Sequence, residues 1–267
     1  MYAHRGGAAL RPENTIASFD HGLSLGADGL ELDVHLSRDG VVVVHHDATL
    51  ERTTNGRGRI GALTADELGQ VDAGYWFKAC AEKSRAGSPR EPSFPYRGQG
   101  HGVPRLGKVL ARYPGIPLII ELKVNDPELA RRAIDEVRKA GAVDRVAFGS
   151  FGWRVLRAAR QYEPRISTGA SREEVRLALY RSWVRWPLRS PEYREFQVPE
   201  RSGATRIISR RFIAHAHRAG LPVKVWTVND PHDMRRLLDW GVDALISDLP
   251  DLAVAAVAEQ SSKVLKF

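Results

Sequence analysis

Residues 118–150 read LIIELKVNDPELARRAIDEVRKAGAVDRVAFGS, and this stretch indicates the architecture of the chain. An apolar run over 118–124 predicts a strand, apolar residues at helical spacing over 127–140 predict a helix, and 146–150 predicts another strand. Short strands that alternate with helices in this way are typical of α/β folds with a parallel sheet.

The same alternation extends toward both ends of the chain. Asn14 or Thr15 is expected to cap an early helix, and Gly26 to end it, because glycine favours the position after a helix. The other predicted elements are strands over 1–4, 29–36, 41–45, 166–169, 195–198, 221–228 and 244–247, and helices over 153–161, 173–183, 210–219, 232–240 and 252–259. Without the strand over 41–45, eight principal strands remain, which predicts a (β/α)8 TIM barrel and a single domain over 1–267.

Residues 47–104 interrupt this periodicity. The segment is rich in Gly, Arg, Thr and Pro, and it is too long to be a plain connection between a strand and a helix. We expect it to form a small cap-like insertion near the mouth of the barrel, and to shape the binding pocket there.

Composition narrows the class of protein. The chain has 267 residues, and its single cysteine, Cys80, excludes an internal disulfide and fits a reducing compartment. A strand predicted at the first residue leaves no room for a signal peptide, so a cytoplasmic location is expected. The net charge of +8 favours anionic partners, but no nucleic-acid-binding motif accompanies it, so a nucleic-acid function is not expected.

Three carboxylates from two predicted strands suggest a metal site. Glu31 and Asp33 lie two residues apart, so their side chains share one face of a strand, and in a barrel that face is the interior. Glu121 ends a later strand, and Lys123 faces the same way. Oxygen ligands without a cysteine favour Mg²⁺ or Ca²⁺. A network of salt bridges with Lys123 and Arg5 is the alternative interpretation.

Two histidines end or follow strands that lead to the same mouth. His4 closes the first strand, and His46 follows the strand over 41–45. Cleavage of a phosphodiester needs a base for the attacking hydroxyl and an acid for the leaving alcohol, and histidine suits both near neutral pH. A structural role is expected for the remaining histidines, His21, His35, His45, His101, His215, His217 and His232.

A series of short motifs runs along almost the whole chain. In order they are His4-Arg5-Gly6, Pro12-Glu13-Asn14-Thr15, GADGLELDV (26–34), His46-Asp47, LERTT (50–54), Glu121-Leu122-Lys123, VWTVN (225–229) and DLP (248–250). Their order and spacing closely resemble the glycerophosphodiester phosphodiesterases. Ser247 departs from the threonine that is usual in the family before Asp248, and this departure leaves the chemistry unchanged.

The resemblance implies a barrel hydrolase that splits glycerophosphodiesters into sn-glycerol 3-phosphate and an alcohol. The implied roles are metal ligands for Glu31, Asp33 and Glu121, acid/base catalysis for His4 and His46, phosphate binding for Arg5 and Lys123, and a wall for the glycerol for Trp226. Packing within the barrel is the alternative interpretation of Trp226. Either the glycerol 2-hydroxyl attacks first and gives a cyclic phosphate, or water attacks directly. The sequence does not distinguish these two routes, and it does not show which histidine is the base.

Two other classes of function compete with this one. A phospholipase of the same broad barrel group, acting on sphingomyelin or phosphatidylinositol, is disfavoured because secretion and disulfides, which would favour the sphingomyelin enzymes, are not indicated. A catalytically silent module that binds phosphate or lipid would be expected to lack one of the site residues, and none is missing.

Residues 177–189, LALYRSWVRWPLR, interleave large apolar residues with arginines. Such a segment can lie at a membrane surface, where aromatic rings favour the interface and arginines approach lipid phosphates. One interpretation is that the segment brings the mouth to lysophospholipid at a bilayer, for a lysophospholipase D reaction. The other is a barrel helix with an exposed arginine face.

Overall fold

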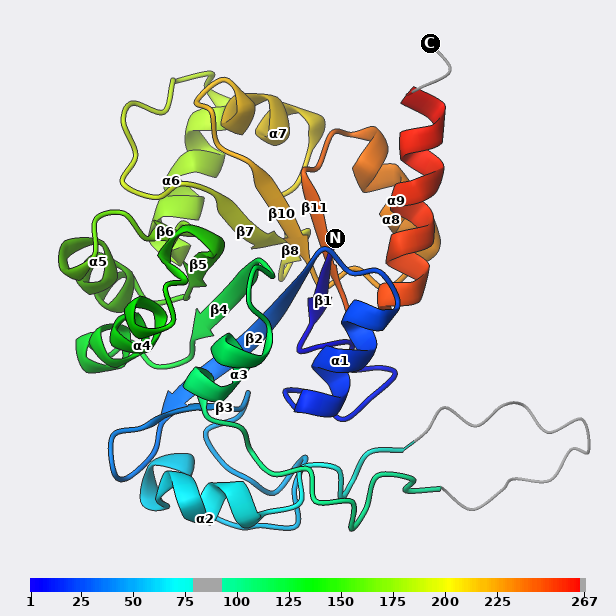
Figure 1. Ribbon diagram of the computed structural model, residues 1–267. Coiled ribbons are helices and arrows are strands. Elements are labelled where there is room, and N and C mark those ends of the chain that lie inside the picture. Colours follow the sequence, from blue (N-terminus) through cyan, green and yellow to red (C-terminus); the bar gives the residue numbers. More distant parts are fainter. Residues whose placement is uncertain (79–92, 265–267) are drawn as a thin grey trace, which may run out of the picture.

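The computed structural model describes residues 1–78 and 93–264, and a ring of parallel strands forms its centre (Figure 1). Cys80 lies outside the described residues. The ring contains β1 (Tyr2–His4), β2 (Gly29–Leu36), β4 (Leu118–Leu122), β5 (Val146–Gly149), β6 (Ser167–Thr168), β7 (Phe196–Pro199), β10 (Val223–Trp226) and β11 (Ala244–Ser247). These are the eight strands that the sequence predicts, and their ends differ from the predicted ones by at most two residues.

The order of the strands closes the ring. Neighbouring strands follow the order β6-β5-β4-β2-β1-β11-β10-β7. A parallel bridge between Gly169 and Glu195 then joins the end of β6 to the start of β7, with hydrogen bonds of 2.9 and 3.1 Å on either side of it. A closed ring of eight parallel strands is the TIM barrel that the sequence predicts.

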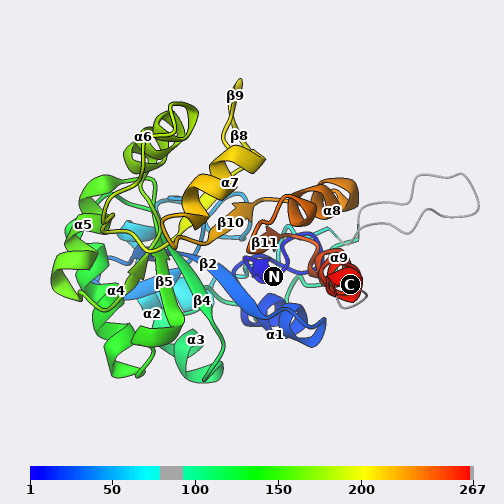
Figure 2. The ribbon, with the colours of Figure 1, turned by 90° about the horizontal axis from the view of Figure 1, so that it is seen from above.

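Helices cover the outside of the ring, as the view from above in Figure 2 shows. They are α1 (Ile16–Ser24), α3 (Leu106–Arg112), α4 (Pro127–Lys139), α5 (Trp153–Tyr162), α6 (Arg172–Trp183), α7 (Arg210–His217), α8 (Pro231–Asp239) and α9 (Pro250–Val264). Between strands and helices lies a continuous apolar core that includes the fully buried Phe148, Phe196 and Phe212. Most of these helices follow directly after the carboxyl end of a ring strand, whereas α3 follows the inserted segment and α7 follows a hairpin. The carboxyl ends of the ring strands form the mouth.

Several short elements were not predicted from the sequence, among them one helix at the outside of the ring and one hairpin. Helix α3 is only seven residues long and has Gly107 in its second position, so its apolar spacing was too short to stand out. The hairpin of β8 (Arg201–Ser202) and β9 (Thr205–Arg206) stands out beyond α7 in Figure 2, and its short exposed strands carry no apolar alternation.

The described part of the segment over 47–104 lies at the mouth end of the barrel. In Figure 1 the arrowheads of β1, β2 and β4 point toward the end where α2 (Ala65–Gln70) lies. Short strand β3 (Val42–Val44) pairs antiparallel with β2 and leads into this segment. A second, smaller apolar cluster holds it in place, and its members are Val43, Leu50, Ile60, Ala65, Leu68 and Val103.

The structure of the loop before α1 shows which of the two predicted residues, Asn14 or Thr15, caps that helix. Thr15 is the N-cap, since its hydroxyl accepts a hydrogen bond from the Ser18 amide at 3.2 Å. Asn14 has φ +58° instead, a left-handed conformation that asparagine tolerates, and its side chain turns toward the barrel. The loop thus supplies both a helix cap and a polar group for the mouth.

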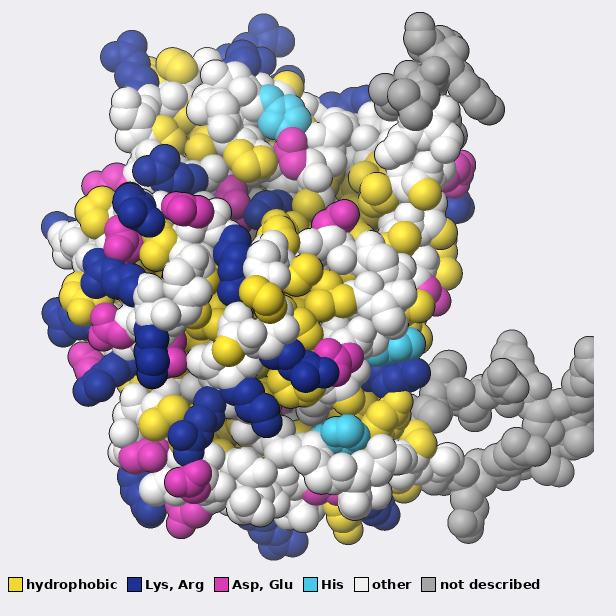
Figure 3. All heavy atoms as spheres, viewed as in Figure 1, with side chains coloured by type: hydrophobic (Ala, Val, Ile, Leu, Met, Phe, Trp, Pro, Cys, Tyr) yellow, Lys and Arg dark blue, Asp and Glu magenta, His cyan; other side chains and the backbone are white. Residues whose placement is uncertain are grey.

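Charges are spread over the surface. Figure 3 shows Lys and Arg on many parts of one face, interleaved with Asp and Glu. Several arginines are tied to acidic neighbours, for example Arg112 to Asp20 at 2.7 Å and Arg132 to Glu128 at 2.7 Å. In the described part of the chain, no helix has the length and apolarity needed to cross a membrane.

Candidate active site

Three carboxylates meet inside the mouth. Asp33 on β2 lies beside Glu121 on β4 in the register of the sheet, and Glu31 precedes Asp33 by one inward position. One oxygen from each of the three carboxylates lies within 4.8 Å of the others. Glu31 and Asp33 are buried and Glu121 is half-buried, so the structure brings together the three predicted metal ligands.

Two cations border this cluster. Arg5 Nε lies 3.3 Å from Asp33 Oδ2, and Lys123 Nζ lies 3.4 Å from Asp33 Oδ1 and 3.2 Å from Glu121 Oε1. These contacts are the salt bridges of the alternative interpretation. Neither cation donates a hydrogen bond to Glu31. Among the described residues, the only hydrogen bond to its carboxylate comes from the Arg5 backbone amide, 3.1 Å from Oε2. Burial, and then the Asp33 carboxylate, raise the pKa of Glu31 to about 8.

His4 is held by a carboxylate from the far end of the chain. Its Nδ1 donates to Asp248 Oδ1 at 2.6 Å, and Asp248 in turn accepts from Asn229 Nδ2 at 2.8 Å. Asn229 is fixed by the Ser247 hydroxyl, which donates to it at 3.1 Å. Burial is the largest influence on the pKa of His4 and lowers it, but the carboxylates of Glu31 and Asp248 outweigh it and raise the pKa above the usual value.

His46 is held by its neighbour in sequence. Its Nδ1 donates to Asp47 Oδ1 at 2.6 Å, and Arg52 Nε donates to Asp47 Oδ2 at 2.5 Å. Arg52 also donates to both oxygens of Glu13, at 2.8 and 2.7 Å, and Glu13 accepts from Arg5 at 3.0 Å. Burial raises the pKa of Asp47, yet the hydrogen bonds from Arg52 and His46 outweigh it and hold this pKa well below the usual value.

A cavity of about 720 Å³ opens over these groups. Its inner end is lined by His4, Arg5, Glu31, His46, Glu121 and Lys123. Trp226 also lines it, half-buried, with its ring packed edge-on against Phe151 at 5.8 Å between centroids. Seven of the eight predicted site residues therefore face one cavity, and the eighth, Asp33, lies directly beneath it with its carboxylate buried.

The predicted role of 47–104 in shaping this pocket is wrong for the described part of that segment. None of its described residues lines the cavity. The outer wall comes instead from the loop after β5, the first turns of α6, and the loop after β7 that carries the β8–β9 hairpin. Arg52 shows what the segment does contribute, because it supports His46 from behind.

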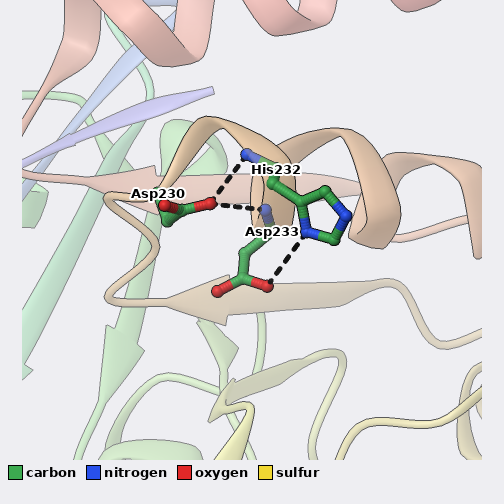
Figure 4. Close-up of side chains that lie close together, drawn as sticks. All are labelled: Asp230, His232 and Asp233. Carbon is green, nitrogen blue, oxygen red and sulfur yellow. Dashed lines mark hydrogen bonds and ion pairs between the residues drawn. The ribbon is translucent and has the colours of Figure 1, made fainter.

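A second acidic group lies on the surface and has a structural explanation. Figure 4 shows Asp230 accepting hydrogen bonds from the backbone amides of His232 and Asp233, at 2.8 and 3.1 Å. Asp230 is thus the N-cap of α8, and His232 points outward with Nδ1 4.0 Å from Asp233. The structural role predicted for His232 agrees with this position, and His35, His45 and His217 also make hydrogen bonds.

His101 and His215 fit the structural role less well. Their Nε2 atoms are buried and have no hydrogen-bond partner among the described residues. Neither residue lines the cavity over the carboxylates.

Reasoning from the sequence assigned no role to the groups that orient the site residues. Asp248 and Asp47 hold the two histidines, and Asn14 Nδ2 donates to Asp33 Oδ2 at 2.9 Å. These residues stand within the motifs quoted above, so the motifs held the signal. What the sequence lacked was the contact partner, which only the fold supplies.

Comparisons with known proteins agree with this geometry. A model of the glycerophosphoryl diester phosphodiesterase family matches residues 4–252. The glycerophosphodiester phosphodiesterase of Bacillus subtilis is 31% identical over 260 residues, covering 94% of this chain and 83% of that protein. Human lysophospholipase D GDPD1 is 26% identical over 275 residues, covering 93% of this chain and 82% of that protein.

A solved structure extends the likeness to three dimensions. An Oleispira antarctica phosphodiesterase, solved in complex with the product sn-glycerol-3-phosphate, superposes with a TM-score of 0.73 at 26% identity, over 96% of each chain. The family match covers nearly all of this chain, from His4 to Leu252. This chain therefore belongs to the glycerophosphodiester phosphodiesterase family of enzymes.

Proposed function

We propose that this enzyme hydrolyses glycerophosphodiesters to sn-glycerol 3-phosphate and an alcohol, with a divalent metal ion and two histidines. The observation that carries the proposal is the inner end of the cavity, where two carboxylate-bound histidines border the same cluster of acidic groups. The product bound to the Oleispira antarctica relative supports the choice of substrate.

The acidic cluster suits a hard divalent cation. Asp33 Oδ1 is buried and accepts no hydrogen bond in the described structure, and Glu31 is the least compensated of the three carboxylates. Glu31, Asp33 and Glu121 would hold Mg²⁺ or Ca²⁺ through oxygen atoms only. Such an ion, when bound, offsets negative charge on the phosphate and makes its phosphorus more open to attack.

Arg5 and Lys123 are proposed to bind the phosphate oxygens. Both line the inner end of the cavity, and both are already held in place by acidic partners, Arg5 by Glu13 and Lys123 by Glu121. A phosphodiester carries one negative charge, so it gains charge-assisted hydrogen bonds from these two cations. Trp226 is proposed to pack against the glycerol, from its place on the cavity wall.

His4 and His46 are proposed to move the protons. In each ring Nδ1 is engaged by a carboxylate, so Nε2 is the atom proposed to meet the substrate. Nε2 of His4 lies 3.7 Å from Glu31 Oε2, beyond hydrogen-bond distance. One imidazole takes the proton of the attacking hydroxyl as the new P–O bond forms. The other, as imidazolium, gives its proton to the alcohol oxygen as the old P–O bond breaks. The attacking hydroxyl belongs either to water, which gives glycerol 3-phosphate directly, or to C2 of the glycerol. Attack by C2 expels the alcohol and gives a cyclic phosphate, which a water molecule must then open to glycerol 3-phosphate.

The metal and the products can be tested together. Release of glycerol 3-phosphate from glycerophosphocholine, glycerophosphoethanolamine and a lysophospholipid is measured with Mg²⁺, with Ca²⁺ and in excess EDTA. EDTA should abolish release, and one of the two ions should restore it. Calorimetry of metal binding to Glu121→Gln provides a readout that does not depend on turnover. Full activity in EDTA would contradict the metal assignment.

Lysophospholipase D activity at a membrane surface is the second candidate. Five large apolar side chains between 177 and 186 are exposed, which is unusual for so short a segment, and Arg181, Arg185 and Arg189 alternate with them. The five are Leu177, Tyr180, Trp183, Val184 and Trp186. The human relative named as a lysophospholipase D supports this substrate class.

The direction of α6 determines which part of the barrel would contact the membrane. The helix begins at the mouth and runs away from it, so Trp183 and Trp186 lie toward the opposite end of the barrel. Contact through these rings would lay the side of the barrel along the bilayer instead of pointing the mouth at it. Co-sedimentation with anionic vesicles tests the idea, and unchanged binding when Trp183 and Trp186 become alanine would exclude it.

A further inference from the structure

The two sides of the mouth differ in chemistry. In the closed ring, β1 and β6 lie opposite each other, with three strands between them on either side. His4, Arg5 and the carboxylates belong to the side of β1, β2 and β4. The outer wall of the cavity belongs to the side of β6, where the first turns of α6 face the cavity. A substrate whose phosphate binds at Arg5 and Lys123 therefore extends its larger substituent toward α6.

The described wall on the α6 side is largely apolar, with a few neutral polar residues, two cations and no acidic residue. Its apolar members are Phe151, Ala170, Val175, Leu179, Pro199 and Ile207. The two cations are Arg172 and Arg176, one helical turn apart. Apart from Glu31 and Glu121 at the inner end, no Asp or Glu lines the described cavity. A positively charged alcohol would find repulsion here and no carboxylate.

Arg172 and Arg176 are exposed, and neither has an ionic partner in the described part of the chain. Among the described residues, neither arginine makes a hydrogen bond or an ion pair with an acidic group, although Arg172 lies over the ring of Phe151 at 5.1 Å. Arg160 on the neighbouring helix shows the contrast, because it binds both oxygens of Glu174 at 2.7 and 3.0 Å. Of the two acidic residues nearest in sequence, Glu174 is thus already taken, and the exposed Glu173 makes no ion pair with either arginine in the described structure. Both guanidinium groups remain available to a ligand in the cavity.

We propose that Arg172 and Arg176 form an anion subsite for the leaving alcohol, so that the enzyme prefers glycerophosphodiesters whose alcohol carries a negative charge. This inference rests on the proposed function and names a substrate class for it. Guanidinium groups bind phosphate oxygens in a bidentate manner, and two of them one turn apart can hold one phosphate group together. Neutral alcohols gain nothing from this subsite, and choline or ethanolamine is disfavoured by it.

Three substrates that differ in the charge of the alcohol test the subsite. Glycerophosphoglycerol releases a neutral alcohol, glycerophosphocholine a cationic one, and bis(glycerophospho)glycerol an alcohol with one phosphodiester charge. At low ionic strength we expect kcat/KM for the anionic substrate to exceed that for the neutral one by about tenfold. In the double variant Arg172→Gln/Arg176→Gln this ratio should fall to near one. Arg154→Gln, an exposed arginine on α5 outside the cavity lining, is the matched control and should keep the ratio.

A binding measurement separates this inference from the proposed function. Glycerol 1,3-bisphosphate has no diester bond to cleave, so its binding can be followed by calorimetry even if turnover fails. The double variant should bind it about tenfold more weakly than the wild type and the Arg154→Gln control. Equal binding, or a substrate ratio that the double variant leaves unchanged, would overturn the subsite. Failure to release glycerol 3-phosphate from any of the three substrates would instead contradict the proposed function.

Discussion

His4 and His46 make the same local hydrogen bond but are supported in different ways. Each Nδ1 lies 2.6 Å from an aspartate oxygen. The partner of His4 is Asp248, which lies 244 positions away and follows β11, the strand beside β1 in the ring. The partner of His46 is the next residue, Asp47, which is fixed by Arg52 from the inserted segment. One histidine is thus held by the barrel, and the other by an ion-paired loop.

Exposure follows the same division. The side chain of His4 is 13% exposed and that of His46 is 28% exposed. Arg52, which supports the His46 side, is 48% exposed, so its ion pairs are open to solvent and to screening by salt. A barrel support is rigid because many strands fix it at once. The loop support of His46 depends on one exposed side chain, Arg52, so a single substitution or high salt can weaken it.

The largest expected effect is the loss of either histidine. His4→Ala and His46→Ala should each lower kcat by about 10³-fold, because general acid and general base catalysis contribute about 10²- to 10⁴-fold each. Circular dichroism should show an unchanged fold, since both rings line the cavity and neither belongs to the apolar core. Retention of more than about a tenth of kcat by either variant would remove that histidine from the proposed mechanism.

The next effect separates the two orienting carboxylates. Asp248→Asn and Asp47→Asn should each lower kcat by about 10- to 100-fold, the range seen when a partner that orients a functional histidine is lost. Because Asp248 helps to raise the pKa of His4, Asp248→Asn should lower this pKa and move one limb of the pH–rate profile toward lower pH. If the acidic limb of the pH–rate profile moves, His4 is the general base, because a base must be deprotonated to act. If the basic limb moves, His4 is the general acid. A profile that does not move would contradict the role of Asp248.

A smaller effect is expected from the outer supports. Arg52 makes three hydrogen bonds to two carboxylates, whereas Asn229 donates one to Asp248. Arg52→Gln should therefore lower kcat by about tenfold, and Asn229→Ala by less. Arg52→Lys should restore little, because an ammonium group cannot reproduce the paired geometry of the guanidinium. High salt should screen these ion pairs and lower kcat of the wild type toward that of Arg52→Gln. The same salt should leave kcat of Arg52→Gln nearly unchanged, since that variant has already lost them.

The two supports also show how far the sequence could be used to predict the site. The βα alternation gave the ring of eight strands, because apolar periodicity is a local property. The pair His46-Asp47 is visible in the sequence as a dipeptide. The pair His4–Asp248 is not, since only closure of the ring brings β11 beside β1. The prediction that 47–104 shapes the pocket was wrong for its described residues for the same reason, because the wall depends on where α6 and the β8–β9 hairpin pack.

The smallest expected effect is an absence of coupling between the two supports. Arg52 and Asn229 share no hydrogen-bond partner, so the losses in Arg52→Gln and Asn229→Ala should add in the double variant, to within about 0.5 kcal/mol. Arg52→Gln and Glu13→Gln share two hydrogen bonds and should not add, which makes this pair the matched control. Strong coupling between Arg52 and Asn229 would show that the two histidines are held by one continuous network through Glu13 and Arg5. The supports of His4 and His46 would then form one hydrogen-bonded network, and the inserted segment would influence the position of both histidines.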